Sequence, residues 1–215
     1  MAKEIYCLSG LGVDERVFQK LNFSGYSITF IKWITPVENE SMEHYASRLL
    51  EQIESKNPVL IGLSFGGMMA IEIAKQIETE MVVLISSSKN KWEVPLYYRM
   101  TGKLRLHKLL PLRLIQLTRP FANWIFGAKS CFDKTLLKQI LLEMDLVFLK
   151  WAIDKIVNWK NETTIKSLLH IHGTNDHILP FRFVNCDLKI KGGGHLMVLN
   201  RAEEMNMLLA EILEP

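Results

Sequence analysis

The chain has 215 residues, 48% of them hydrophobic, which is enough for one sizeable core but short for two full domains. The net charge of +3 is mild, so nothing global favours a nucleic acid partner, and no apolar run reaches the roughly 20 residues that insertion into a membrane requires. Three cysteines without metal-ligand spacing, and a start without a signal pattern, favour a cytoplasmic protein that needs no metal or cofactor.

Short apolar strands alternate with helical stretches along most of the chain. This alternation predicts an α/β fold with a mostly parallel sheet flanked by helices. Hydrophobic periodicity predicts strands at residues 4–9, 26–33, 59–61, 81–86, 168–173 and 187–192. It predicts helices or helical turns at about 13–20, 40–55, 65–78 and 196–213.

The middle of the chain interrupts this alternation. Residues of about 89–162 have apolar side chains at helical spacing throughout and are expected to be wholly helical. An insertion after an apolar strand would rest over the carboxyl edge of the sheet, where open α/β folds bind ligands. We therefore expect a helical cap at 89–162 on a core built from 1–88 and 163–215.

One short stretch, VLIGLSFGGMMA at residues 59–70, changes from strand formers to helix formers within a few residues. A turn this tight can force its apical residue into a strained conformation, and flanking glycines allow it because they lack a Cβ atom. Gly62 and Gly66 flank Ser64 in this way. The turn would present the Ser64 hydroxyl beside backbone N–H groups, a site suited to a nucleophile and a developing oxyanion.

Four motifs, spread over nearly the whole chain, resemble those of the α/β-hydrolases. GLSFGG resembles the serine elbow, HGTNDHILP the turn that carries the acid, and GGGH the loop that carries the base. The resemblance implies a catalytic triad of Ser64, His195 and Asp176, with the histidine as general base and the aspartate as its orienting acid. It also implies the α/β-hydrolase fold with a helical cap.

The fourth motif, LSGLG at residues 8–12, resembles the oxyanion loop of these proteins. Leu11 and Phe65 would donate the two backbone N–H groups of the oxyanion hole. Ser9 stands where the family often has histidine, a departure with little consequence because the loop acts through backbone amides.

The acid and the other histidines also have plainer interpretations. Asp176 could merely form a turn with Asn175. His172 is expected to be structural, with a hydrogen bond near the acid loop. The remaining histidines, His44, His107 and His170, are expected at the surface or in packing.

The serine nucleophile favours an acyl-transfer hydrolase that cleaves an ester or thioester of a small hydrophobic acyl group. The alternative is a protein that binds or senses a ligand on a hydrolase fold, with slow or no turnover. Bulky cap residues could line a substrate pocket or simply pack the cap onto the core. The predicted substrate-binding residues are Trp92, Tyr97, Phe121, Trp124 and Phe126.

The predicted cap is basic in its first part. Against the single acid Glu93, residues 89–119 contain Lys89, Lys91, Arg99, Lys103, Arg105, Lys108, Arg113 and Arg119. A solvated helical face explains such a cluster, but the cluster could also dock an acidic carrier to which the acyl group is attached.

Overall fold

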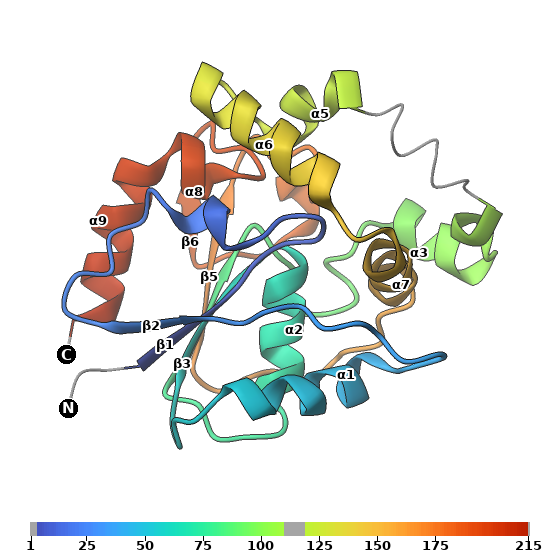
Figure 1. Cartoon of the computed structure of the whole chain (residues 1–215), viewed down its shortest axis with the longest axis horizontal. Helices are drawn as coiled ribbons and strands as arrows, with labels where there is room; N and C mark the ends of the chain where they lie inside the picture. Colours follow the sequence, from blue (N-terminus) through green and yellow to red (C-terminus); the bar gives the residue numbers. More distant parts are fainter. Residues whose placement is uncertain (1–3, 110–118, 215) are drawn as a thin grey trace.

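The computed structural model describes residues 4–109 and 119–214, and its centre is a six-stranded parallel sheet (Figure 1). The order β2-β1-β3-β4-β5-β6 places β3, the strand that Ser64 follows, near the middle. The predicted α/β class and the six predicted strands are therefore confirmed. The strands are β1 (Glu4–Leu8), β2 (Ser27–Phe30), β3 (Val59–Leu63), β4 (Met81–Ile85), β5 (Leu168–Gly173) and β6 (Leu188–Ile190).

Two hydrophobic clusters cover the two faces of the sheet, because alternate side chains of each strand point to opposite faces. One cluster takes Ile5 and Cys7 of β1 and packs against the helices at the C-terminus of the chain. The other takes Tyr6 and Leu8 and packs against α1 and α2. All five residues of β3 are buried, as expected for a strand covered on both faces.

The helices of the core lie close to their predicted positions. The helix expected at 196–213 is broken at Arg201 into two, because that residue leaves the helical conformation with φ −133°. The core elements are η1 (Glu15–Phe18), α1 (Met42–Leu49), η2 (Leu50–Gln52), α2 (Phe65–Ala74), η4 (Phe181–Phe183), α8 (Met197–Asn200) and α9 (Ala202–Leu213).

Between β4 and β5 the chain forms the helices α3 (Leu96–Lys103), η3 (Leu106–Leu109), α5 (Arg119–Phe126), α6 (Cys131–Glu143) and α7 (Leu146–Val157). The expectation of a wholly helical segment is wrong at its start, where residues 89–95 hold no regular helix. Glu93 is buried in this start and accepts backbone N–H groups of Lys89 and Asn185, which fixes a non-helical path.

The inserted helices pack into the core clusters rather than resting on them. Leu137 and Ile140 of α6 belong to the cluster on one face of the sheet, and Phe148 and Ala152 of α7 to the other. Figure 1 shows α6 above the sheet and α7, seen along its axis, beside α3. A separate cap at 89–162 stays a prediction. Among the described helices, none has the length and hydropathy to cross a membrane.

Candidate active site

Ser64 lies at the turn between β3 and α2 with φ +55° and ψ −120°, a backbone conformation that L residues rarely adopt. The turn is held from two sides. The Ser64 amide donates to the carbonyl of Ile85 in β4 at 2.9 Å, and the Ser87 hydroxyl donates to the Ser64 carbonyl at 2.6 Å. The conformation is thus imposed by neighbouring strand ends, which supports the predicted elbow.

Three glycines make this turn possible. A Cβ atom on Gly62 would lie 2.4 Å from the Cα atom of Gly67, and one on Gly66 would lie 2.2 Å from the carbonyl oxygen of Leu8. A Cβ atom on Gly67 would lie 2.4 Å from the Ser87 hydroxyl oxygen. Each contact is too short for a real Cβ atom, so the elbow requires glycine at all three positions.

The structure brings Ser64, Asp176 and His195 together from three distant parts of the sequence. His195 Nε2 lies 2.8 Å from Ser64 Oγ, and its Nδ1 lies 2.7 Å from Asp176 Oδ2. Both separations fall in the range expected of a nucleophile, a base and the group that orients the base. Asp176 and His195 are only 3% and 2% exposed, so little water competes for these hydrogen bonds.

The second oxygen of Asp176 is also fully used. Asp176 Oδ1 accepts the backbone N–H groups of Ile178 at 2.8 Å and Leu179 at 2.9 Å. Burial would raise the pKa of Asp176, but attraction to His195 and the hydrogen bonds outweigh it, and the pKa is lowered from its usual value. Asp176 is therefore an ionised acceptor held toward His195.

Two buried histidines lie behind the acid. His172 Nε2 donates to the Leu179 carbonyl at 2.8 Å and lies 3.6 Å from Asp176 Oδ2, which confirms the predicted hydrogen bond near the acid loop. His172 Nδ1 lies 3.3 Å from His170 Nε2. Burial lowers the pKa of His172 and lowers that of His170 to about 3, so both rings are neutral at pH 7.

The predicted oxyanion loop lies against the nucleophile. A Cβ atom on Gly10 would be 3.2 Å from the Ser64 Cβ atom, which places Leu11 one residue away from that contact. Among the described residues, no group accepts the backbone N–H of Leu11 or Phe65. An oxyanion role for these two amides stays a prediction.

Ser9, at the position where the sequence resemblance led us to expect histidine, fixes this loop through hydrogen bonds. Its hydroxyl donates to the Val13 carbonyl at 2.9 Å and accepts the indole N–H of Trp33 at 3.0 Å. The side chain is 4% exposed. Ser9 therefore joins the two ends of the loop and also connects the loop to the segment that follows β2.

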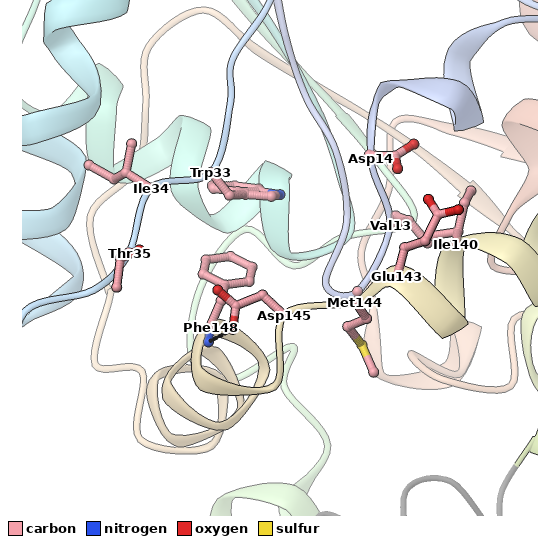
Figure 2. Close-up of a pocket in the computed structure, with 11 residues that line it drawn as sticks. Val13, Asp14, Trp33, Ile34, Thr35, Ile140, Glu143, Met144, Asp145 and Phe148 are labelled. Carbon is pink, nitrogen blue, oxygen red and sulfur yellow. Dashed lines mark hydrogen bonds between the residues drawn. The ribbon is translucent and has the colours of Figure 1, made fainter.

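A cavity of about 190 Å³ adjoins the oxyanion loop (Figure 2). Its walls come from the loop, from the segment after β2 and from the junction of α6 and α7. Figure 2 shows Trp33 over Phe148 on one side, Val13 and Ile140 on the other, and Met144 between these two groups.

The predicted substrate-binding aromatics do not line this cavity, as far as the described residues define it. Trp92 and Trp124 are 61% and 65% exposed, and Tyr97 and Phe121 are exposed as well. Phe126 contacts the triad, with its ring centre 6.1 Å from that of His195. A substrate contact of these five residues stays a prediction.

Sequence reasoning missed the two aromatic residues that do line the cavity, Trp33 and Phe148. Their rings stack at 5.1 Å. Trp33 ends the predicted second strand, and carboxyl ends of parallel strands gather at the ligand edge of the sheet, so its position could have identified it. Phe148 carries no such signal, because it fits the apolar pattern of α7.

The basic residues of the insert have varied surroundings. Lys89 lies 3.6 Å from Asp187, Lys91 pairs with Glu162, and the Arg99 guanidinium lies 5.1 Å from the Trp92 ring centre. Arg113 lies outside the described residues, and Arg119 is the first residue of α5. The exposed cations of α3 and the turns after it are Lys103, Arg105 and Lys108.

Potential metal ligands are dispersed in the described parts of the chain, 4–109 and 119–214, where no three His, Cys, Asp or Glu side chains gather as a metal site would need. The groups that the structure brings together are the Ser64 hydroxyl, the two ring nitrogens of His195 and the Asp176 carboxylate.

Comparison with known proteins identifies the fold. No protein-family model and no curated protein matches the sequence. The structure is similar to a bromoperoxidase from Bacillus anthracis (TM-score 0.71, 20% identity, 100% of this chain and 93% of the other). It is also similar to a thermophilic esterase from Thermogutta terrifontis (TM-score 0.70, 15% identity, covering 99% of this chain and 90% of the other). A third similar structure is a hydrolase from Oleispira antarctica (TM-score 0.72, 15% identity, covering 99% of this chain and 91% of the other). The chain has the α/β-hydrolase fold.

Proposed function

We propose that the chain is a serine hydrolase that cleaves a carboxylic ester or thioester of a small hydrophobic acyl group. The observation that carries the proposal is the pair of contacts made by His195, at 2.8 Å to Ser64 and 2.7 Å to Asp176. Acyl transfer needs a nucleophile, a base that moves its proton, an acid that orients the base, and donors that stabilise the oxyanion. The proposed site has a candidate for each of these roles. The esterase and hydrolase names among the fold neighbours support the same class.

The first half-reaction forms an acyl-enzyme. Ser64 Oγ attacks the carbonyl carbon while its proton passes to His195 Nε2, and the resulting oxyanion accepts the N–H groups of Leu11 and Phe65. Asp176 stabilises the imidazolium through Nδ1. The bond to the leaving alcohol or thiol then breaks, and His195 Nε2 gives it the proton.

The second half-reaction releases the acid. Water takes the place of the leaving group and attacks the acyl carbon while giving a proton to His195 Nε2. The bond to Ser64 Oγ breaks as the tetrahedral intermediate collapses, and the proton returns to that oxygen. The carboxylic acid leaves, and the enzyme regains its starting protonation state.

The finer features of the substrate follow from the same proposal. The substrate is a small molecule, free or attached to an acidic carrier that meets the basic residues of the insert. The site needs no metal or cofactor and no nucleic acid partner. A cytoplasmic location stays a prediction.

The test is a panel of p-nitrophenyl esters of rising chain length, assayed with wild type and Ser64→Ala. Wild type should cleave at least one ester, and Ser64→Ala should retain less than about a thousandth of that activity, the level at which residual binding and oxyanion stabilisation can still act. Ser24→Ala, a change to an exposed serine, is the matched control and should leave activity unchanged.

The outcomes separate two classes of protein. If Ser64→Ala keeps more than that residual rate, the nucleophile is another group and the proposal is wrong. If wild type binds ester analogues and turns none over, the chain is a binding or sensing protein on a hydrolase fold.

A further inference from the structure

The cavity of Figure 2 is lined by the residues that directly follow the predicted oxyanion donor Leu11 in the chain, Gly12, Val13 and Asp14. Gly12, the residue after Leu11, lines it, and so does Trp33, whose ring centre lies 5.5 Å from that of Phe65. Leu11 and Phe65 are the two candidate oxyanion donors. A carbonyl oxygen held between those amides would therefore lie close to the Gly12 and Trp33 walls of this cavity.

The wall of the cavity is mostly apolar and aromatic. Val13, Trp33, Ile140 and Phe148 contribute side chains, and Met144 lies against the loop, where a Cβ atom on Gly12 would come 2.6 Å from its sulfur. A dry apolar cavity of about 150 Å³ is large enough to hold benzene. A cavity of about 190 Å³ therefore suits a short hydrocarbon group.

The rim carries more negative than positive charge. Arg16 Nη2 lies 2.6 Å from Asp14 and 2.5 Å from Glu143, so one guanidinium pairs with two carboxylates. Asp145, exposed at the start of α7, adds a third carboxylate to the lining. A substrate with a carboxylate at the far end of its acyl chain would meet charge of its own sign there.

We infer that this cavity is the acyl subsite, and that it selects a short acyl chain of about four to six carbons without a terminal negative charge. The inference rests on the proposed function and adds the class of substrate to it. Met144 sets the length of the subsite because its side chain fills the space next to Gly12. Asp145 contributes the selectivity against an anionic end.

Two substitutions at one position test the length of the subsite. Met144→Ala removes three heavy atoms from the wall and should raise the ratio of kcat/KM for p-nitrophenyl octanoate over butanoate about 10-fold or more. Met144→Phe adds bulk and should lower the same ratio. Leu142→Ala is the matched control, because Leu142 lies two residues before Met144, in the last turn of α6, and lines a different depression.

The readout is the ratio of two substrates in one variant, so a loss of folded protein cancels, and melting temperatures identify any variant that fails to fold. Opposite changes of the ratio in the two Met144 variants, with no change in Leu142→Ala, would establish the subsite. A ratio that stays the same in both variants, while hydrolysis still depends on Ser64, would overturn the inference and leave the proposed function intact. An absence of any Ser64-dependent hydrolysis would overturn both.

The charge selectivity is tested with methyl hexanoate and monomethyl adipate, which have acyl chains of the same length and differ in the terminal carboxylate. Wild type should prefer methyl hexanoate. Asp145→Asn should lower the ratio of kcat/KM for methyl hexanoate over monomethyl adipate about 2-fold to 5-fold at low salt. Added salt should lower the same ratio in wild type. Asparagine keeps the cap of α7, in which Asp145 accepts the N–H groups of Val147 and Phe148. A wild-type preference for the adipate ester that Asp145→Asn leaves unchanged would contradict this part.

Discussion

The elbow around Ser64 and the cavity wall around Met144 lie on either side of the oxyanion loop and are built in different ways. At the elbow, backbone packs on backbone, and a Cβ atom on Gly66 would lie 2.2 Å from a main-chain oxygen. At the cavity wall the closest approach to the loop, at Gly12, is made by the sulfur of the flexible Met144 side chain. The elbow therefore leaves no choice of residue, whereas the wall can change in size.

This difference separates reactivity from selectivity. The groups proposed to react are fixed by strand ends, glycines and buried hydrogen bonds, so changes there should abolish activity or the fold. The groups proposed to select the acyl chain are side chains of the inserted helices and the loop. Changes there should alter which ester is cleaved while the rate on the best substrate stays of the same order.

The largest effect is expected from the acid. Asp176→Asn keeps the shape of the side chain but removes the charge that holds His195 in the productive tautomer, so kcat should fall about 10³-fold to 10⁴-fold on every ester. Stopped assays with a long and a short ester measure both rates. Asn175→Ala, at the exposed neighbour, should retain full activity. Equal activity of Asp176→Asn and wild type would remove Asp176 from the proposed triad.

The next largest effect is expected at the elbow backbone. Gly66→Ala forces a carbon atom onto the Leu8 carbonyl and should lower the free energy of unfolding by about 3 kcal/mol or more, or prevent folding. Gly25→Ala is the control that separates steric overlap from backbone strain, because Gly25 has φ +91° but an added Cβ atom would meet nothing within 4 Å. This change should lower the free energy of unfolding by about 1 kcal/mol. Urea unfolding compares the two. A Gly66→Ala protein as stable as Gly25→Ala would contradict the close packing of Gly66 on the Leu8 carbonyl.

A pH effect is expected from the histidine pair behind Asp176. Burial lowers the pKa of His170 to about 3, whereas the unfolded chain binds a proton near pH 6.5. The unfolded state thus holds more protons between these values, and stability falls on acidification. Between pH 7 and pH 5 wild type should lose about 2 kcal/mol through this group, and His170→Leu should show a correspondingly smaller loss. Urea midpoints at the two pH values measure the loss of stability in each protein. Equal losses in wild type and His170→Leu would contradict the neutral buried state of His170.

The smallest effect is expected from the basic residues of the insert. If an anionic carrier meets α3 and the turn after it, Lys103→Glu with Arg105→Glu should raise KM for a carrier-bound acyl group several-fold, and salt should reduce the difference over a Debye length of about 8 Å. A small neutral ester should be cleaved as before, because these residues are exposed and lie outside the cavity. Equal losses on both substrates with a lower melting temperature would assign the two residues to packing of the insert.

The sequence was most informative where backbone geometry decides the structure. The change from β3 to α2 within a few residues, with glycines around one serine, predicts the elbow because no other residue fits there. The spacing in HGTNDHILP and GGGH predicts the two other members of the site through resemblance to the α/β-hydrolases. The separations at His195 agree with that expectation.

The sequence was least informative where packing between distant segments decides the structure. Trp92 and Trp124 have the composition expected of a pocket, but the segments that carry them leave both rings exposed. Phe148 is indistinguishable in pattern from its neighbours in α7, and only the crossing of α7 past Trp33 makes it part of a cavity. Helical periodicity identifies a buried face and does not say which element covers it.

The most direct test of the proposed triad is covalent labelling of wild type with a fluorophosphonate, followed by mass spectrometry of the peptides. We expect one adduct, on Ser64, which is absent from Ser64→Ala. In His195→Ala and Asp176→Asn it should form much more slowly, because the base no longer activates the hydroxyl. An adduct on another residue, or a rate of Ser64 labelling that does not depend on His195, would contradict the proposed triad.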